Sequence, residues 1–232
     1  MHAQPIWDIP LRLFHWLLVI AIVGAIITGQ NGFWFWHEKF GLAVLGLLLF
    51  RLIWGVIGGH HACFANFRLA PASVIAYFKQ RRQTLFRRDP THAAGHSPFG
   101  AWATVLILAV LLALALSGNM ANNGILYEGP IARLLAGTDG IATVSDLATE
   151  VHESLEGVLF FVIALHLIAI VSYRLLWGIR LLPAMTRGIT DTTLPAMTKP
   201  DYWIHQISGI VMLVSCVGLA QSLGIATTAS YL

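Results

Sequence analysis

Four of the ten histidines in this 232-residue chain lie within long apolar segments or at their ends: His15, His37, His152 and His166. A neutral imidazole carries one nitrogen lone pair and one N–H group, and it is the side chain that most often binds a metal ion. A single histidine inside a membrane ordinarily makes a hydrogen bond to a neighbouring helix. Four such residues at related positions favour ligand chemistry instead.

His152 and His166 are separated by fourteen residues. At about 100° per residue, this spacing comes within about 40° of four whole turns, so both side chains leave the same face of one helix. Their positions along the axis differ by about 21 Å, which is most of the thickness of a bilayer's hydrocarbon core. Arg51 follows His37 by the same fourteen residues, so it faces the same way further along its own helix.

Five segments are long and apolar enough to carry these residues across a membrane, since each span needs about 20 residues. They are residues 11–29, 38–58, 99–117, 155–178 and 203–222. We therefore predict an all-α integral membrane protein, a four-helix transmembrane bundle plus a fifth transmembrane helix. The bundle takes residues 1–185, and residues 186–232 form a linker and the additional helix. Residues 73–85 predict a short amphipathic helix on the membrane surface.

Basic residues predict the orientation, because short cytoplasmic loops are enriched in lysine and arginine. Most of them lie between the second and third spans or after the fourth: Arg68, Lys79, Arg81, Arg82, Arg87, Arg88, Arg180, Arg187 and Lys199. The loop before the fourth span is acidic, and Thr143 with Asp146 predicts a capping box that starts the fourth helix ahead of the membrane. The N-terminus is therefore expected in the cytoplasm and the C-terminus on the outer side.

This topology sorts the four histidines into two pairs at matched depths. His15 and His166 lie toward the inner side, and His37 and His152 lie at the outer side. Each pair could supply both axial ligands to an iron porphyrin, and an iron with two imidazole ligands has no open position, which suits electron transfer. Arg51 would face the inner site, where it would pair with a haem propionate. The bundle is thus predicted to bind haem.

Two alternatives to haem binding remain open from the residues alone. A metal site without haem is one, although no carboxylate or thiolate lies at matching depth on the inner side, and neither His-Glu pair extends to His-Glu-x-x-His. The second is a non-redox transporter or membrane anchor, in which the histidines relay protons or pack between helices. That protein would be colourless, and the chain lacks the paired short spans that favour a transporter.

Composition excludes several classes of protein. Hydrophobic residues make up 57% of the chain and charged residues 11%, against about 25% charged in an average soluble domain. A soluble enzyme, a disordered chain and a nucleic-acid binder are therefore excluded. The two cysteines, Cys63 and Cys216, form no Cys-x-x-Cys-His motif, which excludes covalent c-type haem attachment.

The motifs together resemble one family, the bacterial di-haem cytochrome b561 proteins, which include the cytochrome b subunits of nickel–iron hydrogenases. Phe14-His15-Trp16 resembles the first ligand motif of that family, and His37 with Arg51 resembles its second-helix pattern. Gly95-His96-Ser97-Pro98-Phe99-Gly100 resembles the start of its third span. His152-Glu153 with His166 resembles its fourth-helix ligand pair. The resemblance covers about residues 5–185, and the fifth span departs from the common four-helix core.

The resemblance implies two non-covalent haem b groups, with His15 and His166 holding the inner haem iron and His37 and His152 the outer one. It implies electron transfer between a membrane quinone and a redox partner, either a c-type cytochrome or a peripheral oxidoreductase subunit, at a bacterial inner membrane. Whether the chain is itself an enzyme stays open. Some relatives oxidise superoxide at the outer haem and reduce quinone, which is an alternative here.

Three residues are candidates for a quinone site by their depth alone: Arg12, His96 and His205. The acidic outer loop is expected to steer a basic partner by electrostatic attraction. The fifth span contains no residue with evident redox chemistry apart from His205 at its edge. It is expected to contact a partner subunit or a second copy of the chain.

Overall fold

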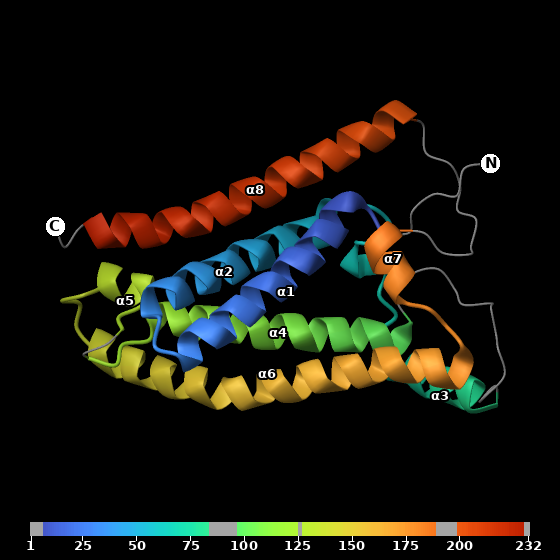
Figure 1. Ribbon diagram of the computed structural model, residues 1–232, viewed down its shortest axis with the longest axis horizontal. Coiled ribbons are helices and arrows are strands. Elements are labelled where there is room, and N and C mark those ends of the chain that lie inside the picture. Colours follow the sequence, from blue (N-terminus) through green and yellow to red (C-terminus); the bar gives the residue numbers. More distant parts are fainter. Residues whose placement is uncertain (1–6, 84–96, 125–126, 189–198, 230–232) are drawn as a thin grey trace. The chain divides into compact units, whose positions relative to one another are not determined.

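The computed structural model describes residues 7–83, 97–124, 127–188 and 199–229, and the elements in these ranges are all helices (Figure 1). In chain order they are α1 (Ile9–Gln30), α2 (Trp34–Ile57), the short 3-10 helix η1 (Phe64–Asn66), α3 (Pro71–Gln83), α4 (Pro98–Met120), α5 (Pro130–Leu134), α6 (Ile141–Trp177), α7 (Leu182–Arg187) and α8 (Lys199–Ala229).

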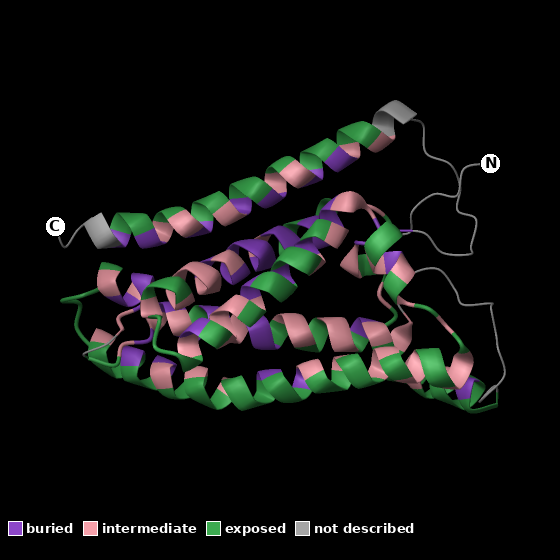
Figure 2. Ribbon diagram, in the orientation of Figure 1, coloured by how far each residue is buried: buried purple, intermediate pink, exposed green. Residues whose placement is uncertain are grey.

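Five of these helices, α1, α2, α4, α6 and α8, are long and apolar enough to cross a membrane, which confirms the predicted spans and fold class. Apolar residues are exposed along much of their length, and Figure 2 shows exposed positions running along α6 and α8. Lipid can cover such faces, because hydrocarbon chains are as apolar as the side chains themselves. α2 differs, since 56% of the residues in its most apolar stretch are buried, against 11% in the corresponding stretch of α6.

The start of α6 differs from the sequence prediction. The helix begins at Ile141, so Thr143 and Asp146 lie inside its first turns and the predicted capping box is wrong. Gly140 has φ of 80°, a left-handed conformation that glycine adopts without steric cost, and this turn starts the helix earlier. α6 is one helix of 37 residues that carries both His152 and His166. A helix is present where residues 73–85 predicted one, as α3, but its apolar residues do not gather on one face, so the predicted amphipathic character is wrong and its place on the membrane surface stays a prediction.

A tight turn between α1 and α2 brings His37 back toward the end of α1. Gly32 has φ of 71°, and the N–H of Phe33 donates a 2.9 Å hydrogen bond to the carbonyl of Thr28. This is the left-handed glycine termination common at helix C-termini. Because the connection from Gln30 to Trp34 is so short, the first turn of α2 lies beside the last turns of α1.

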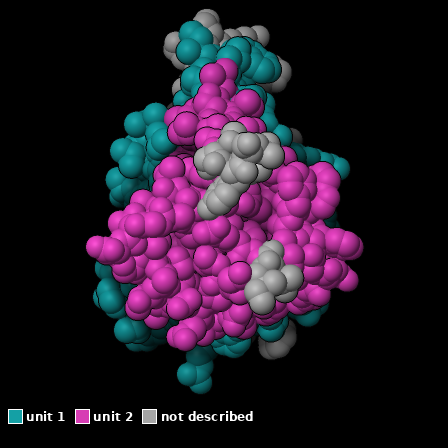
Figure 3. Space-filling view, turned by 90° about the vertical axis from the view of Figure 1, so that its left-hand side faces the viewer, with its two compact units in different colours: residues 1–13, 52–107, 161–210 teal, residues 14–51, 108–160, 211–232 magenta. Residues whose placement is uncertain are grey.

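The chain forms two compact units, coloured separately in Figure 3. Unit 1 contains residues 1–13, 52–107 and 161–210, and unit 2 contains residues 14–51, 108–160 and 211–232. Each of the five long helices contributes one segment to each unit. His37 and His152 both belong to unit 2, whereas His15 belongs to unit 2 and His166 to unit 1.

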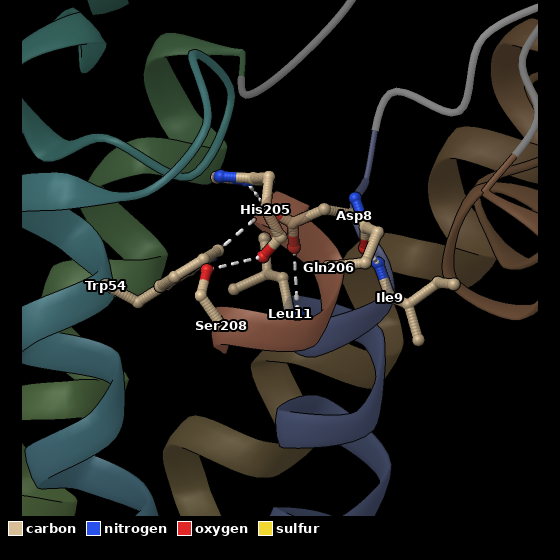
Figure 4. A network of polar contacts seen from close by, with 7 residues as sticks. All are labelled: Asp8, Ile9, Leu11, Trp54, His205, Gln206 and Ser208. Atoms are coloured by element: carbon tan, nitrogen blue, oxygen red, sulfur yellow. Dashed lines mark hydrogen bonds and ion pairs between the residues drawn. The ribbon is translucent and has the colours of Figure 1, made fainter. Parts of the chain in front are cut away.

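In unit 1, the start of α1 is fastened to the first part of α8 (Figure 4). Asp8 accepts a hydrogen bond from the N–H of Leu11 at 2.9 Å, which caps α1, and the N–H of Ile9 donates to Gln206 Oε1 at 2.7 Å. Gln206 is buried, with 2% of its surface exposed. α8 is therefore held in this unit by a hydrogen bond to the N–H group of Ile9, which α1 itself leaves unsatisfied.

Unit 1 also holds α3 against the end of α6. The hydroxyl oxygens of Tyr77 and Tyr173 lie 2.7 Å apart, and Ser97 Oγ lies 3.2 Å from that of Tyr173. Trp177 Nε1 donates to the carbonyl of Arg81 at 3.2 Å. The basic loop is thus tied to the membrane bundle through aromatic residues with polar groups, as expected for the interface between lipid and water.

In unit 2, the second part of α8 packs directly on α2. A Cβ atom added at Gly46 would lie 2.6 Å from Val217 Cα, so the two backbones approach as closely as glycine allows. Further along, Gln221 Nε2 donates to the carbonyl of Lys39 at 2.8 Å. The fifth helix is therefore an integral part of this unit, although its own residues carry no evident redox chemistry there.

Candidate functional site

The imidazole rings of His37 on α2 and His152 on α6 face each other in unit 2. Their centroids lie 6.1 Å apart and their planes are nearly perpendicular, at 89°. Two residues that are 115 positions apart in the sequence thus meet at one point, as their matched depths predicted. Among the described residues, no group of three or more histidine, cysteine or acidic side chains could hold a metal ion. The two imidazoles are therefore the donor set at this position.

Each ring is held from behind by a backbone carbonyl. His37 Nδ1 lies 2.8 Å from the carbonyl oxygen of Ala25, and His152 Nδ1 lies 2.9 Å from that of Leu114. A carbonyl oxygen only accepts, so Nδ1 carries the proton in both rings and Nε2 keeps the lone pair. This is the arrangement of a histidine prepared to bind a metal through Nε2.

Glycines make room for the two rings. A Cβ atom at Gly29 would lie 2.8 Å from His37 Nδ1, and one at Gly118 would lie 2.8 Å from His152 Cε1. The rings therefore rest directly on the backbones of α1 and α4. Neither glycine was identified from the sequence. The available signal is that each lies near the end of an apolar span, at the depth predicted for the outer histidines.

A cavity of about 520 Å³ opens beside both histidines, within the size range of ligand and cofactor sites. Most of its lining is apolar and comes from α1, α2, α4 and the chain after α4, and α6: Ile22, Ala25, Ile26, Gly29, Gly41, Val44, Leu111, Leu114, Ala115, Gly118, Ala121 and Leu159. A smaller void of about 30 Å³ lies between the two histidines, Asn119 and Tyr127. The site can therefore accept a large, flat apolar group that reaches both imidazoles.

The charged groups around this cavity are mainly acidic. Glu153 and Glu156 line it, and Gln30 Nε2 lies 3.4 Å from Glu156 Oε1. Glu38, next to His37, is neutralised by Arg133, whose NH2 group lies 2.7 Å from Glu38 Oε2. Among the described lining residues, no lysine or arginine is present.

Tyr127 closes the cavity from the loop before α5. Its hydroxyl donates to the carbonyl of Gly118 at 3.1 Å, and its ring lies 6.3 Å from that of Trp34. Burial raises the pKa of Tyr127 above its ordinary value, and the negative charge of Glu38 raises it further. The phenol therefore stays neutral and acts as a hydrogen-bond donor beside the histidine site.

The chain is similar to one family of known proteins. A family model described as prokaryotic cytochrome b561 matches residues 6–188. The chain belongs to this family. The resemblance inferred from the histidine motifs is confirmed. No curated protein and no solved structure matches the chain. The family match ends before α8, so the fifth helix lies outside it.

Membership identifies a multi-pass membrane b-type cytochrome that binds haem b and transfers electrons across the membrane. The His37–His152 site of this cytochrome b561 fits such a group. Metal–imidazole bonds are about 2 Å long, as in zinc sites, so rings on opposite sides of one metal have centroids about 6 Å apart. The observed separation is 6.1 Å. Haem brings its own four equatorial nitrogens, and the cavity has room beside the two imidazoles.

The remaining predicted ligands lie on the expected helices. His15 is on α1, where its ring lies 5.2 Å from that of Trp16, and His166 is on α6. The two residues belong to different units, so their pairing stays a prediction. Arg51 on α2 has 2% of its surface exposed, which places a permanent charge inside an apolar helix bundle. Its role as a propionate partner also stays a prediction.

Of the three quinone candidates, the structure describes two. Arg12 donates from NH1 to the carbonyl of Thr186 at 2.9 Å. His205 Nε2 lies 3.4 Å from Asp8 Oδ2, and its ring lies 4.7 Å from that of Trp54 (Figure 4). His96 lies outside the described residues.

Asp8 was not identified from the sequence as a partner of His205. Asp8 Oδ2 also accepts a 3.0 Å hydrogen bond from Trp54 Nε1, so one carboxylate joins α1, α2 and α8 within unit 1. The available signal was the position of Asp8 two residues before Pro10, which is typical of a helix start. That signal predicts the cap on α1, but not the contact with a residue on the last helix of the chain.

Proposed function

We propose that this cytochrome b561 holds two haem b groups and links the membrane quinone pool to a redox partner on the outer side. His37 and His152 hold the outer haem iron, and His15 and His166 hold the inner one. The observation that carries the proposal is the outer pair, two imidazoles 6.1 Å apart with both Nδ1 atoms engaged by carbonyls. Bound haem supplies the one-electron chemistry, because its iron changes oxidation state without a change of ligands.

The protein's own residues keep the outer site dry and fixed. Apolar side chains line the cavity and would exclude water, and His37 and His152, whose rings are nearly perpendicular, would hold the haem iron. Arg51 neutralises a propionate of the inner haem. Residues 1–185 form the di-haem core, and residues 186–232 add the linker and the fifth helix. The protein lies in the bacterial inner membrane, with its N-terminus in the cytoplasm and its C-terminus in the periplasm.

The partner is a protein with a basic docking surface, either a c-type cytochrome or a peripheral oxidoreductase subunit. Glu153 and Glu156 line the outer cavity, and opposite charges steer proteins together over tens of ångströms at low salt. The same two carboxylates repel the superoxide anion, so the site does not favour the alternative of superoxide oxidation. Membership in a b-type cytochrome family likewise favours electron transfer over a transporter or anchor.

Replacing both Glu153 and Glu156 with glutamine is expected to slow electron transfer from quinol to a basic c-type cytochrome several-fold at low salt. In the unchanged protein, the rate should fall as ionic strength rises from about 0.01 M to about 1 M, because the Debye length shrinks from about 30 to about 3 Å. Asp139→Asn removes an exposed charge that does not line the cavity and serves as the control. A rate independent of salt in all three proteins would contradict the steering.

At the inner side, His205 is the candidate that exchanges protons with the quinone. A quinol that reduces haem gives up two electrons and two protons, so a base must take the protons. The His205 side chain is 23% exposed, and its Nε2 lies 3.4 Å from Asp8 Oδ2. In the reverse direction, the same pair returns protons to the reduced quinone.

His205→Gln is therefore expected to slow quinol-driven haem reduction about 100-fold, which is the lower end of the range of general acid–base contributions. The spectrum reduced by dithionite should not change, because both haems stay bound. His60→Gln is the matched control, since His60 contacts Asn66 and not Asp8. Equal rates in the two variants would remove His205 from the proposed quinone site.

A further inference from the structure

The two outer histidines rest on their neighbouring helices in the same way. His37 lies over Gly29 of α1 and bonds to the carbonyl of Ala25, four residues before that glycine. His152 lies over Gly118 of α4 and bonds to the carbonyl of Leu114, again four residues before the glycine. One helical turn therefore supplies both the gap and the acceptor at each ring.

The offset of four residues has a physical reason. In an α-helix, a carbonyl accepts its regular hydrogen bond from the N–H four residues later and retains a second lone pair. The side chain of that later residue tilts toward the helix N-terminus and covers this lone pair. Glycine has no side chain, so the carbonyl stays accessible from outside the helix. Glycine at the later position thus leaves room for a flat ring to approach the carbonyl closely.

We infer that Gly29 and Gly118 are positioning residues for the outer haem, because they admit the two imidazoles to the backbone and so set the potential of the iron. The inference rests on the proposed function, in which His37 and His152 are the ligands. A carbonyl bonded to Nδ1–H fixes the tautomer and the ring orientation, and it makes the imidazole a stronger electron donor. A stronger donor stabilises the oxidised iron and lowers its midpoint potential.

Alanine at either glycine removes the close approach. Its Cβ would lie 2.8 Å from Nδ1 and 3.0 Å from Cε1 of His37, or 2.8 Å from Cε1 and 3.0 Å from Nδ1 of His152. Carbon and nitrogen atoms that are not bonded to each other do not stay at such distances, so the ring must move away. The hydrogen bond from Nδ1 to the carbonyl then lengthens and weakens.

The test compares Gly29→Ala and Gly118→Ala with two control variants on the same or adjoining helices. Gly24→Ala crowds α1 equally, since its Cβ would lie 2.6 Å from the ring of Phe40, but it meets no imidazole. Gly157→Ala on α6 has no atom within 4 Å of the new Cβ. The readouts are a redox titration that resolves both haems and the low-temperature electron paramagnetic resonance spectrum of the oxidised protein.

In Gly29→Ala and Gly118→Ala, we expect an upward shift of the outer haem's midpoint potential and a change in its resonance positions. The inner haem should keep its potential in all four, and Gly24→Ala should lower thermal stability without moving either potential. Selective loss of the outer haem in Gly29→Ala or Gly118→Ala would support the same inference, because changes to groups that hold a metal's ligands typically cost about 10- to 100-fold in affinity. Unchanged potentials and resonances in both would overturn it.

A second measurement needs no haem. Nitrogen nuclear magnetic resonance of histidine-labelled protein reports which ring nitrogen carries the proton. His37 and His152 should both show the Nδ1–H form in the unchanged protein, and the form should become mixed at the affected ring in each variant. An Nε2–H form in the unchanged protein would overturn the inference while leaving the two-haem proposal standing. Absence of haem from the purified protein would instead overturn the proposed function itself.

Discussion

Replacing His37 or His152 with alanine should remove one haem and leave the other, and both variants should lose the same one. In the proposed assignment, each ring would supply one of the two protein ligands of a single iron, and the two rings lie 6.1 Å apart. No third histidine lines this cavity among the described residues, so loss of either imidazole should not be compensated by another. Haem content should fall from about two to about one per chain, and electron delivery to the outer partner should fall to background.

The comparison between the two variants is the informative part. Their reduced-minus-oxidised spectra should superimpose, because the remaining haem is the same inner haem in both. Quinol should still reduce that haem at an unchanged rate. His61→Ala is a suitable control, because His61 lies beside Trp7 in unit 1 and is not part of the outer site. Like the outer histidines it is partly buried, and burial lowers the pKa of its imidazole. Different remaining spectra in the two variants would show that His37 and His152 do not share an iron.

Replacing His15 or His166 with alanine should have the complementary result. The outer haem should stay, because its ligands and its cavity lie within unit 2 and do not include these residues. The inner haem should be lost, and quinol should no longer reduce the protein, although dithionite still reduces the remaining haem. Haem analysis and stopped-flow reduction by quinol measure both effects. Retention of two haems in His166→Ala would contradict the inner ligand assignment.

Hydropathy and helical periodicity were sufficient to predict the five spans and the family. A run of about 20 apolar residues leaves a chain few alternatives in a bilayer, so the spans follow from local composition. The meeting of His37 with His152 followed from depth, which residue counting along a helix measures well. The structure brings these two rings together across unit 2. Their roles as iron ligands remain the proposal that the variants above test.

Other features depend on contacts that local patterns do not encode. The early start of α6 at Ile141 depends on the left-handed turn at Gly140. The residues around this turn are polar, so hydropathy alone did not indicate that the helix begins there. Gly29 and Gly118 resemble ordinary small residues of membrane helices until a ring from another helix is placed over each. Asp8 has the position of a helix cap. The contacts of its second oxygen with Trp54 and His205 depend on how α1, α2 and α8 pack in unit 1, which the sequence around Asp8 does not indicate.

The fifth helix lies outside the family match, yet both units use it. In unit 1 its Gln206 accepts from the N–H of Ile9, and in unit 2 its backbone at Val217 lies against Gly46 of α2. The sequence predicted a contact with a partner subunit or a second copy for this helix. The observed contacts are with the chain's own α1 and α2, and the predicted partner contact stays a proposal for its exposed face.

The most direct test of the two-haem assignment is an absorption spectrum of the purified protein in detergent, oxidised and reduced with dithionite, together with the haem content per chain. We expect two non-covalent haem b groups per chain, with sharp reduced bands typical of iron with two imidazole ligands. One haem per chain would contradict the two-site proposal. No haem, from cells that make it in abundance, would contradict the assignment of all four histidines.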